Sequence, residues 1–147
     1  DVEKDVKRIK VRGISLFHDE TGGKQRGGNT VFCVAIDDIN VCHLGDLGHD
    51  PGPDILRVIG AVDILLLPVG GFYTIDAVTA TKIMDDINPK VAMPMHYRTE
   101  KCSFPITTVH EFTRGKKNIR TLRESELEIT EESLPKEPEI VVMQHAL

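Results

Sequence analysis

Short apolar segments that alternate with stretches of helical periodicity are the feature that most constrains how this chain folds. Residues 64–67 are four aliphatic side chains in succession, within a longer apolar segment over residues 61–69. Such a run is typical of a strand that is covered on both faces. Behind it, apolar residues recur at helical spacing up to Ile87, with Thr74 as the predicted N-cap and Asn88 as the predicted end. This alternation predicts an α/β fold.

The rest of the chain fits a single domain over residues 1–147. Further strands and short helices are predicted at residues 7–17, 30–36, 39–43, 54–60 (helix), 90–95, 105–115 (helix), 118–122 and 139–143. The charged stretch 123–138 is expected to be a solvated connection between the last two strands.

The charge balance argues against a nucleic-acid partner. Eighteen Lys and Arg residues are outnumbered by 23 Asp and Glu, which gives a formal net charge of -5. Nucleic-acid binding instead needs clustered cations in excess. The longest apolar run, at residues 62–69, is interrupted by Asp63 and Pro68 and is too short to span a membrane. We therefore expect neither a nucleic-acid partner nor a membrane span.

Three cysteines without a C-x-x-C motif argue against a secreted disulfide scaffold and favour a reducing, cytoplasmic location. If Asp37 and Asp38 form a two-residue turn, Cys33 lies opposite Cys42 across the hairpin. The simpler interpretation of this pair is two reduced thiols in the core.

Residues that carry chemistry follow the predicted strands at the point where each strand ends. His18 comes after the first strand, HLGDLGH occupies residues 43–49, LPVGG occupies 67–71, and PMHY occupies 94–97. Ligand sites of α/β sheets lie outside the carboxyl ends of the strands. His18, Asp46 and His96 are therefore expected along one edge of the sheet.

Two imidazoles and a carboxylate are a usual ligand set for zinc, and they also suit manganese or iron. Gly45 and Gly48 would let the backbone around Asp46 turn sharply toward an ion. A histidine taken alone is more often structural or merely exposed. The metal hypothesis therefore depends on the three residues converging.

These four motifs, in this order, resemble the metallo-β-lactamase superfamily over nearly the whole chain. The branch that looks most similar contains intracellular zinc-dependent hydrolases close to ascorbate-6-phosphate lactonases and N-acyl phosphatidylethanolamine phospholipases D. The resemblance implies the C-terminal half of an αββα sandwich and a two-zinc site. It also implies that His18 and His96 are metal ligands and that Asp46 bridges the two metals.

The hallmark of that superfamily, H-x-H-x-D-H, occurs nowhere in the 147 residues. Three hypotheses compete: a fragment whose N-terminal half lies elsewhere, a half-domain that dimerises, or a relative that has lost metal chemistry. The first residue is Asp rather than Met, which favours a fragment. Half of a sandwich exposes an apolar face, so we expect a retained N-terminal half, a homo-oligomer or poor solubility.

For the complete protein, the resemblance implies hydrolysis of an ester, lactone or phosphoester by water that two metal ions activate. Asp46 and His49 are the predicted catalytic residues, although His49 also fits a role on the surface or behind the ligands. Lys24 and Arg26 suit a small anionic substrate, unless their glycine-rich loop is merely solvated. Tyr97 is a candidate substrate contact or a packing residue. The competing function is a non-catalytic α/β interaction module.

Overall fold

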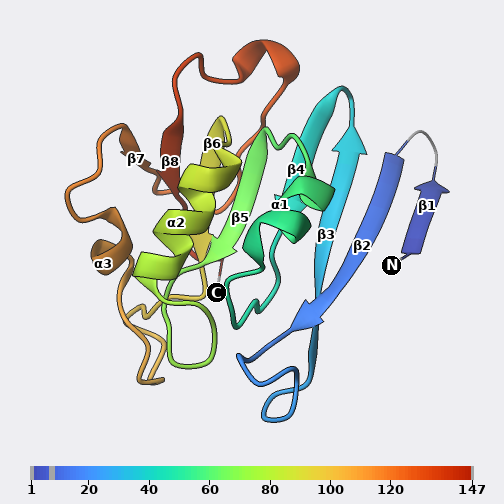
Figure 1. Cartoon of the computed structure of the whole chain (residues 1–147). Helices are drawn as coiled ribbons and strands as arrows, with labels where there is room; N and C mark the ends of the chain where they lie inside the picture. The colour runs from blue at the N-terminus through green and yellow to red at the C-terminus, as the bar shows by residue number, and fades with distance from the viewer. Residues whose placement is uncertain (1, 7–8, 147) are drawn as a thin grey trace.

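One mixed sheet forms the centre of the molecule in the computed structural model, which describes residues 2–6 and 9–146 (Figure 1). Within these residues the sheet has eight strands in the order β1-β2-β3-β4-β5-β6-β8-β7. The strands are β1 (Val2–Val6), β2 (Ile9–Phe17), β3 (Gly28–Ile36), β4 (Ile39–His43), β5 (Ile64–Pro68), β6 (Val91–Met95), β7 (Ile119–Thr121) and β8 (Glu139–Val142). Helices alternate with the parallel strands, so the predicted α/β class is confirmed.

Most of the strands run in the same direction. β1 to β4 form an antiparallel series, whereas β4, β5, β6 and β8 pair in parallel, as do β7 and β8. Because two antiparallel steps separate β2 from β4, β2 ends at the same edge as β4, β5 and β6. This edge lies at the lower end of the view in Figure 1. The prediction that the four motifs share one edge of the sheet is therefore confirmed.

Three helices cover one face of the sheet: α1 (Gly52–Ile59), α2 (Ala77–Ile87) and α3 (Val109–Thr113) (Figure 1). Their apolar side chains pack against strand residues such as Leu65 and Leu67, and Phe112 and Ile83 are fully buried there. No helix in the described part of the chain is long and apolar enough to cross a membrane.

The predicted start of α2 is wrong by two residues. Thr74 is buried, its hydroxyl donates a hydrogen bond to the carbonyl of Ile75, and it lies three residues before the first residue of the helix. Asp76 is the N-cap instead, and its carboxylate accepts a 2.8 Å hydrogen bond from the amide of Thr79. The predicted end is confirmed, since Asn88 adopts the left-handed conformation with φ 52°.

The charged segment after β7 is more than a solvated connection. It contains the 3₁₀ helix η1 (Glu131–Ser133), and its apolar residues Leu127, Ile129 and Leu134 pack against Val141 and its neighbours on the sheet face opposite the helices. That prediction is therefore wrong in its simplest form. The many charged residues of this segment led to the prediction of a solvated connection, because its three apolar residues follow no helical or strand periodicity.

The β3–β4 hairpin has the predicted turn. Asp37 and Asp38 both have positive φ, 48° and 60°, as a two-residue turn that matches the twist of the strands requires. Cys33 pairs directly with Cys42, and both are free thiols. The predicted juxtaposition of the two cysteines is confirmed.

Candidate metal site

Glycine contacts hold the β4–α1 loop against the residue that follows β2. The amide of Gly48 donates a 3.1 Å hydrogen bond to the carbonyl of Phe17. A Cβ at Gly48 would overlap the backbone carbonyl of His18 and the amide nitrogen of Asp19. Only glycine lets the two backbones approach this closely, which brings the His18 and Asp46 loops together.

The loops after β5 and β6 meet in the same way. A Cβ at Gly70 would overlap the carbonyl oxygen of His96, and the amide of Val69 donates a 3.1 Å hydrogen bond to the carbonyl of Met95. His96 itself has a φ of 52°, in the left-handed region that residues other than glycine rarely occupy. Strained backbone of this kind is typical of functional positions.

Three imidazole nitrogens at this edge are buried and have no hydrogen-bond partner among the described residues: His18 Nε2, His49 Nε2 and His96 Nδ1. A buried polar atom without a partner costs free energy, so native structures rarely leave one in place without a reason. An imidazole nitrogen that carries a lone pair is a preferred ligand of zinc and related metals. The donor set therefore fits a metal ion.

His49 has its ring orientation fixed by the backbone. Its Nδ1 lies 2.9 Å from the carbonyl oxygen of Asp50, which can only accept, so Nδ1 donates this hydrogen bond and Nε2 is the nitrogen left for another partner. The sequence predicted a catalytic role for His49 and did not include it among the ligands. In the structure its Nε2 is buried without a partner among the described residues, as are Nε2 of His18 and Nδ1 of His96. The available signal was its position in the same seven-residue string as Asp46.

Asp46 is exposed, and its backbone rather than its side chain is held in place. The side-chain oxygen of Asn29 accepts a 2.9 Å hydrogen bond from the Asp46 amide, while the Asn29 amide group donates to the carbonyl of Leu44 at 2.9 Å. Gly45 has a φ of 62° and donates to Nδ1 of His43. His43 is half-buried, and this hydrogen bond holds the loop that follows it.

The described residues do not complete a metal site by themselves. No three His, Cys, Asp or Glu side chains within residues 2–6 and 9–146 lie close enough together to hold a metal ion. The structure thus brings His18, Asp46 and His96 to one edge of the sheet without forming a three-ligand cluster. Their assignment as ligands stays a prediction.

Asp19 is a structural residue that the sequence did not single out. It is 3% exposed, and its carboxylate accepts five hydrogen bonds of 2.7–3.0 Å from residues 21–26, four from backbone amides and one from the Thr21 hydroxyl. Burial raises the pKa of Asp19, but these donors outweigh burial and hold the pKa well below its usual range. The carboxylate therefore shapes the loop that carries Lys24 and Arg26.

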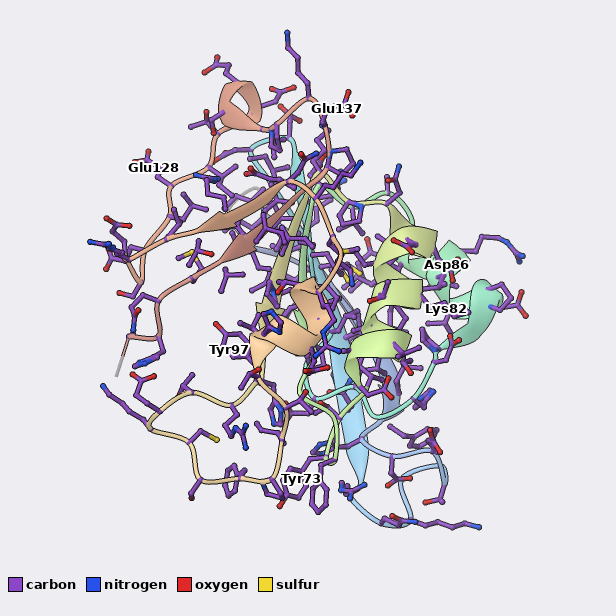
Figure 2. All side chains as sticks on the ribbon, turned by 90° about the vertical axis from the view of Figure 1, so that its left-hand side faces the viewer. Tyr73, Lys82, Asp86, Tyr97, Glu128 and Glu137 are labelled. Atoms are coloured by element: carbon purple, nitrogen blue, oxygen red, sulfur yellow. The ribbon has the colours of Figure 1, made fainter. Side chains whose placement is uncertain are left out.

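The predicted substrate residues differ in where they lie. Lys24 and Arg26 are exposed, and the Arg26 guanidinium lies 5.7 Å from the centre of the Tyr73 ring. Arg26 and Tyr73 line a pocket of about 240 Å³ together with Asp19, Gly48 and neighbouring loop residues. Figure 2 shows Tyr73 at the lower end of the molecule, among the loops of this edge.

Tyr97 has a packing role in the structure. It is half-buried against the core, and its hydroxyl donates a 3.3 Å hydrogen bond to the carbonyl of Met143. Burial raises the pKa of the Tyr97 phenol. These contacts favour the interpretation of Tyr97 as a packing residue. A contact between Tyr97 and the substrate stays a prediction.

The fold and this edge are those of a known class of hydrolase-like domains. Residues 2–96 match the family described as Beta-lactamase superfamily domain, and the chain belongs to this family. A Thermotoga maritima protein, described as a Zn-dependent hydrolase of the metallo-beta-lactamase superfamily, is 38% identical. Its crystal structure superposes with a TM-score of 0.85 over 97% of this chain and 68% of that protein.

Curated relatives give the same class. The chain is 31% identical over 97 residues to a metal-dependent hydrolase of Pyrococcus horikoshii, which covers 65% of this chain and 43% of that protein. It is 39% identical over 74 residues to a metal-dependent hydrolase of Staphylothermus marinus, which covers 50% of this chain and 32% of that protein. The chain therefore spans less than half the length of these relatives.

Proposed function

We propose that this chain supplies metal ligands to a metal-dependent hydrolase, with His18, Asp46 and His96 as the ligands. Three buried imidazole nitrogens without partners, at one edge of the sheet, are the observation that carries the proposal. Zinc is the ion that we propose, and manganese and iron suit the same ligand types.

A bound ion of this kind acts as a Lewis acid and lowers the pKa of a coordinated water to about 7. The two oxygens of the exposed Asp46 carboxylate would allow it to contact two ions. His49, whose buried Nε2 has no hydrogen-bond partner among the described residues, would either accept a proton or serve as a further ligand. We propose an ester, lactone or phosphoester as the bond that the complete protein hydrolyses.

The proposed substrate is a small anion. Arg26 and Lys24 place two cations on the loop that borders the pocket beside the His18 motif, and Asp19 fixes the backbone of that loop. Cations at the mouth of a site raise the local concentration of anionic ligands. A contact between Tyr97 and the substrate requires its hydroxyl to leave the Met143 carbonyl.

The remaining ligands are proposed to come from outside this chain, either from an N-terminal half of the same protein or from a second copy. Two observations support a covering partner. The described residues contain no complete ligand cluster, and Phe32, whose ring lies over Gly13 on the face opposite the helices, is 47% exposed. An aromatic ring exposed on the face of a sheet is typical of a surface that another layer covers. The cytoplasmic location stays a prediction.

Metal analysis of the purified full chain tests the proposal. We expect zinc to bind, and we expect His18→Ala and His96→Ala each to weaken binding by at least about tenfold. His110→Ala is the matched control, because His110 is exposed on α3 and remote in sequence from the motifs. Equal zinc affinity in all four proteins would contradict the proposal.

Sedimentation of the same chain separates the remaining alternatives. A dimer that binds zinc would support ligands from a second copy, and zinc binding only after addition of the N-terminal part of a longer relative would support a split site. A metal-free monomer that stays so in both experiments would instead support a non-catalytic interaction module.

A further inference from the structure

Two free cysteines face each other across the β3–β4 hairpin, and neither is a residue of the candidate metal site. Ile36 and Ile39 close the two-residue turn as a hydrogen-bonded pair, and the pairing alternates from there. Cys33 and Cys42 are three pairs from the turn, so they form a non-hydrogen-bonded pair, whose Cα atoms lie about 4.5 Å apart in antiparallel sheets. Disulfides span Cα separations of about 4.4–6.8 Å. The backbone is therefore already placed for a bond between the two sulfurs.

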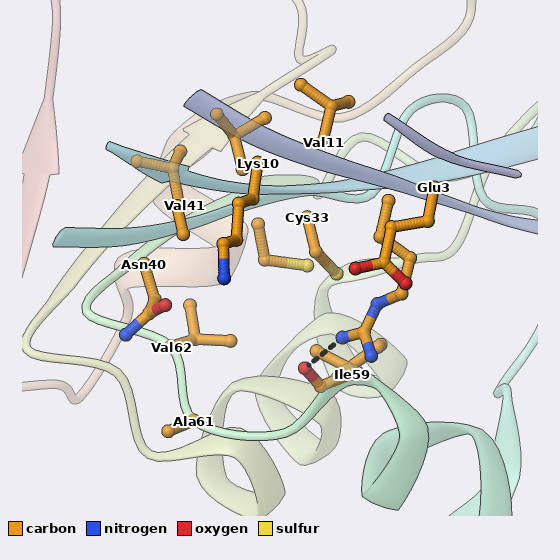
Figure 3. Close-up of a pocket in the computed structure, with 13 residues that line it drawn as sticks. Glu3, Lys10, Val11, Cys33, Asn40, Val41, Ile59, Ala61 and Val62 are labelled. Carbon is orange, nitrogen blue, oxygen red and sulfur yellow. Dashed lines mark hydrogen bonds between the residues drawn. The ribbon is translucent and has the colours of Figure 1, made fainter. Parts of the chain in front are cut away.

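The two thiols differ in access. Both cysteines line a pocket of about 140 Å³ (Figure 3), but Cys42 is fully buried, whereas Cys33 is half-buried. Figure 3 shows the side chains of Glu3, Lys10 and Cys33 turned toward this pocket. Cys33 is thus the more accessible of the two thiols to a small reagent.

The charges around Cys33 come from β1 and β2. Arg12 is the β2 partner of Cys33, and the dashed line in Figure 3 marks the 2.9 Å hydrogen bond that its guanidinium donates to the carbonyl of Ile59. Lys10 on β2 and Glu3 on β1 also line the pocket, and the lining residues that follow α1 are the apolar Ala61 and Val62. This anchoring holds a guanidinium beside the more accessible thiol.

Hydrogen bonding between the two thiols shifts their pKa values in opposite directions. The Cys42 thiol donates to the Cys33 sulfur, which together with Arg12 outweighs burial and lowers the pKa of Cys33 to about 6. The same hydrogen bond, with burial, raises the pKa of Cys42 far above its usual value. Cys33 is therefore the more readily ionised of the two thiols, and Cys42 keeps its proton.

We propose that Cys33 and Cys42 are a redox site that forms a reversible cross-strand disulfide, with a hydroperoxide such as hydrogen peroxide as the oxidant. The Cys33 sulfur attacks one peroxide oxygen, the O–O bond breaks, and the departing hydroxide takes up a proton to leave as water. Cys33 is then a sulfenic acid. The Cys42 sulfur attacks the Cys33 sulfur, the S–O bond breaks, and the Cys42 proton leaves with the hydroxyl as a second water. In total two thiols lose two electrons, and the peroxide gains them.

The bond would join the two strands that lead into the Asp46 loop, since β3 carries Asn29 and β4 ends at His43. The proposal nevertheless rests on the hairpin and its pocket alone. It stands or fails independently of the proposed hydrolase function, because its test measures sulfur chemistry without metal or substrate.

Oxidation of the reduced full chain with a small excess of hydrogen peroxide tests the site. After the remaining thiols are alkylated, intact mass and peptide mapping should show a mass loss of two hydrogen atoms, a Cys33–Cys42 crosslink and one alkylated thiol, Cys102. Dithiothreitol should restore all three thiols. Cys102→Ser is the matched control and should form the same crosslink.

Single variants assign the order of attack. Cys42→Ala should stop at a Cys33 sulfenic acid that dimedone traps, while Cys33→Ala should leave Cys42 unmodified. Arg12→Gln should slow oxidation at pH 7 by about fivefold, and the difference should close above about pH 9, where the thiol ionises without help. If Cys42→Ala does not fold, the pH dependence of the wild-type oxidation rate still tests which thiol attacks first. The rate should rise with pH, with a midpoint below the usual pKa of a thiol. A wild-type chain that stops at sulfenic acid, stays unmodified, or crosslinks through Cys102 would overturn the proposal.

Discussion

Two loops meet at the carboxyl edge of the sheet, and they are held in shape in opposite ways. The β2–β3 loop is held from within, because the buried Asp19 carboxylate accepts five hydrogen bonds from residues of that same loop. The β4–α1 loop is held from outside, by Asn29 on β3 and by the close backbone contact of Gly48 with His18. The first loop is therefore a self-contained turn, and the second takes its shape from its neighbours.

The difference shows why residue type alone does not reveal function. Asp19 lies two residues beyond the end of β2 and Asp46 three residues beyond the end of β4, and both follow a histidine closely in the sequence. All the accepting capacity of Asp19 is used by its own loop, whereas the Asp46 carboxylate is exposed and only its backbone is fixed. A carboxylate held by its backbone remains available to an external ligand.

The largest expected effect comes from breaking the contact between the two loops. Gly48→Ala should lower the free energy of unfolding by more than about 3 kcal/mol, because the new Cβ has only backbone atoms of His18 and Asp19 to displace. Chemical denaturation measures this. Gly28→Ala is the control, since its Cβ would lie 3.9 Å from the nearest atom, and it should leave stability nearly unchanged. A Gly48→Ala protein as stable as the control would show that the loops separate easily.

Removing the charge from each aspartate should sharpen the comparison. Asp19→Asn turns one acceptor into a donor that faces backbone amides, so we expect the melting temperature to fall by about 6 °C or more. Asp46→Asn should change it by less than about 1 °C, because the carboxylate is exposed. Differential scanning calorimetry of both variants gives the comparison. Similar losses in the two proteins would mean that Asp46 also has a structural role.

Acid should destabilise the β2–β3 loop, which contains Asp19, before the β4–α1 loop. The folded-state pKa of Asp19 lies below the value of 3.8 that an unperturbed aspartate has, so its contribution to stability is complete above about pH 4 and declines as the pH falls toward the folded pKa. We expect the wild type to lose stability on acidification below pH 4 more steeply than Asp19→Asn does. Urea denaturation between pH 5 and pH 2 measures the two slopes, and parallel slopes would contradict this assignment.

The sequence predicted the arrangement of this edge better than its internal contacts. Apolar runs and their ends placed His18, Asp46 and His96 correctly on one edge, since strand direction follows from connectivity. The role of Asp19 was not predictable, because its five donors are backbone amides and a hydroxyl of a loop whose conformation no periodicity encodes. The packing of Leu127, Ile129 and Leu134 was missed for a similar reason. Local patterns specify elements, while loop contacts depend on the assembled fold.

The β4–α1 loop should respond to a substitution of Asn29 on β3. Asn29→Ala leaves the Asp46 amide and the Leu44 carbonyl without their partner, so we expect a loss of about 1 kcal/mol in the free energy of unfolding. Asn29→Asp keeps the acceptor for the Asp46 amide but places a carboxylate oxygen against the Leu44 carbonyl, so its loss should be larger. A smaller loss for Asn29→Asp than for Asn29→Ala, measured by chemical denaturation, would assign most of the effect to the Asp46 contact.

The smallest effect concerns the strained backbone of His96, on the third loop of this edge. Because its φ of 52° is costly for any residue except glycine, His96→Gly should be more stable than His96→Ala by about 1 kcal/mol. Both variants should lose zinc binding equally, because both lack the imidazole. Thermal unfolding and zinc titration on the two proteins separate the backbone from the side chain. If the glycine variant is no more stable than the alanine variant, the left-handed conformation at residue 96 does not destabilise the protein. The imidazole side chain alone would then explain why a histidine stands at this position.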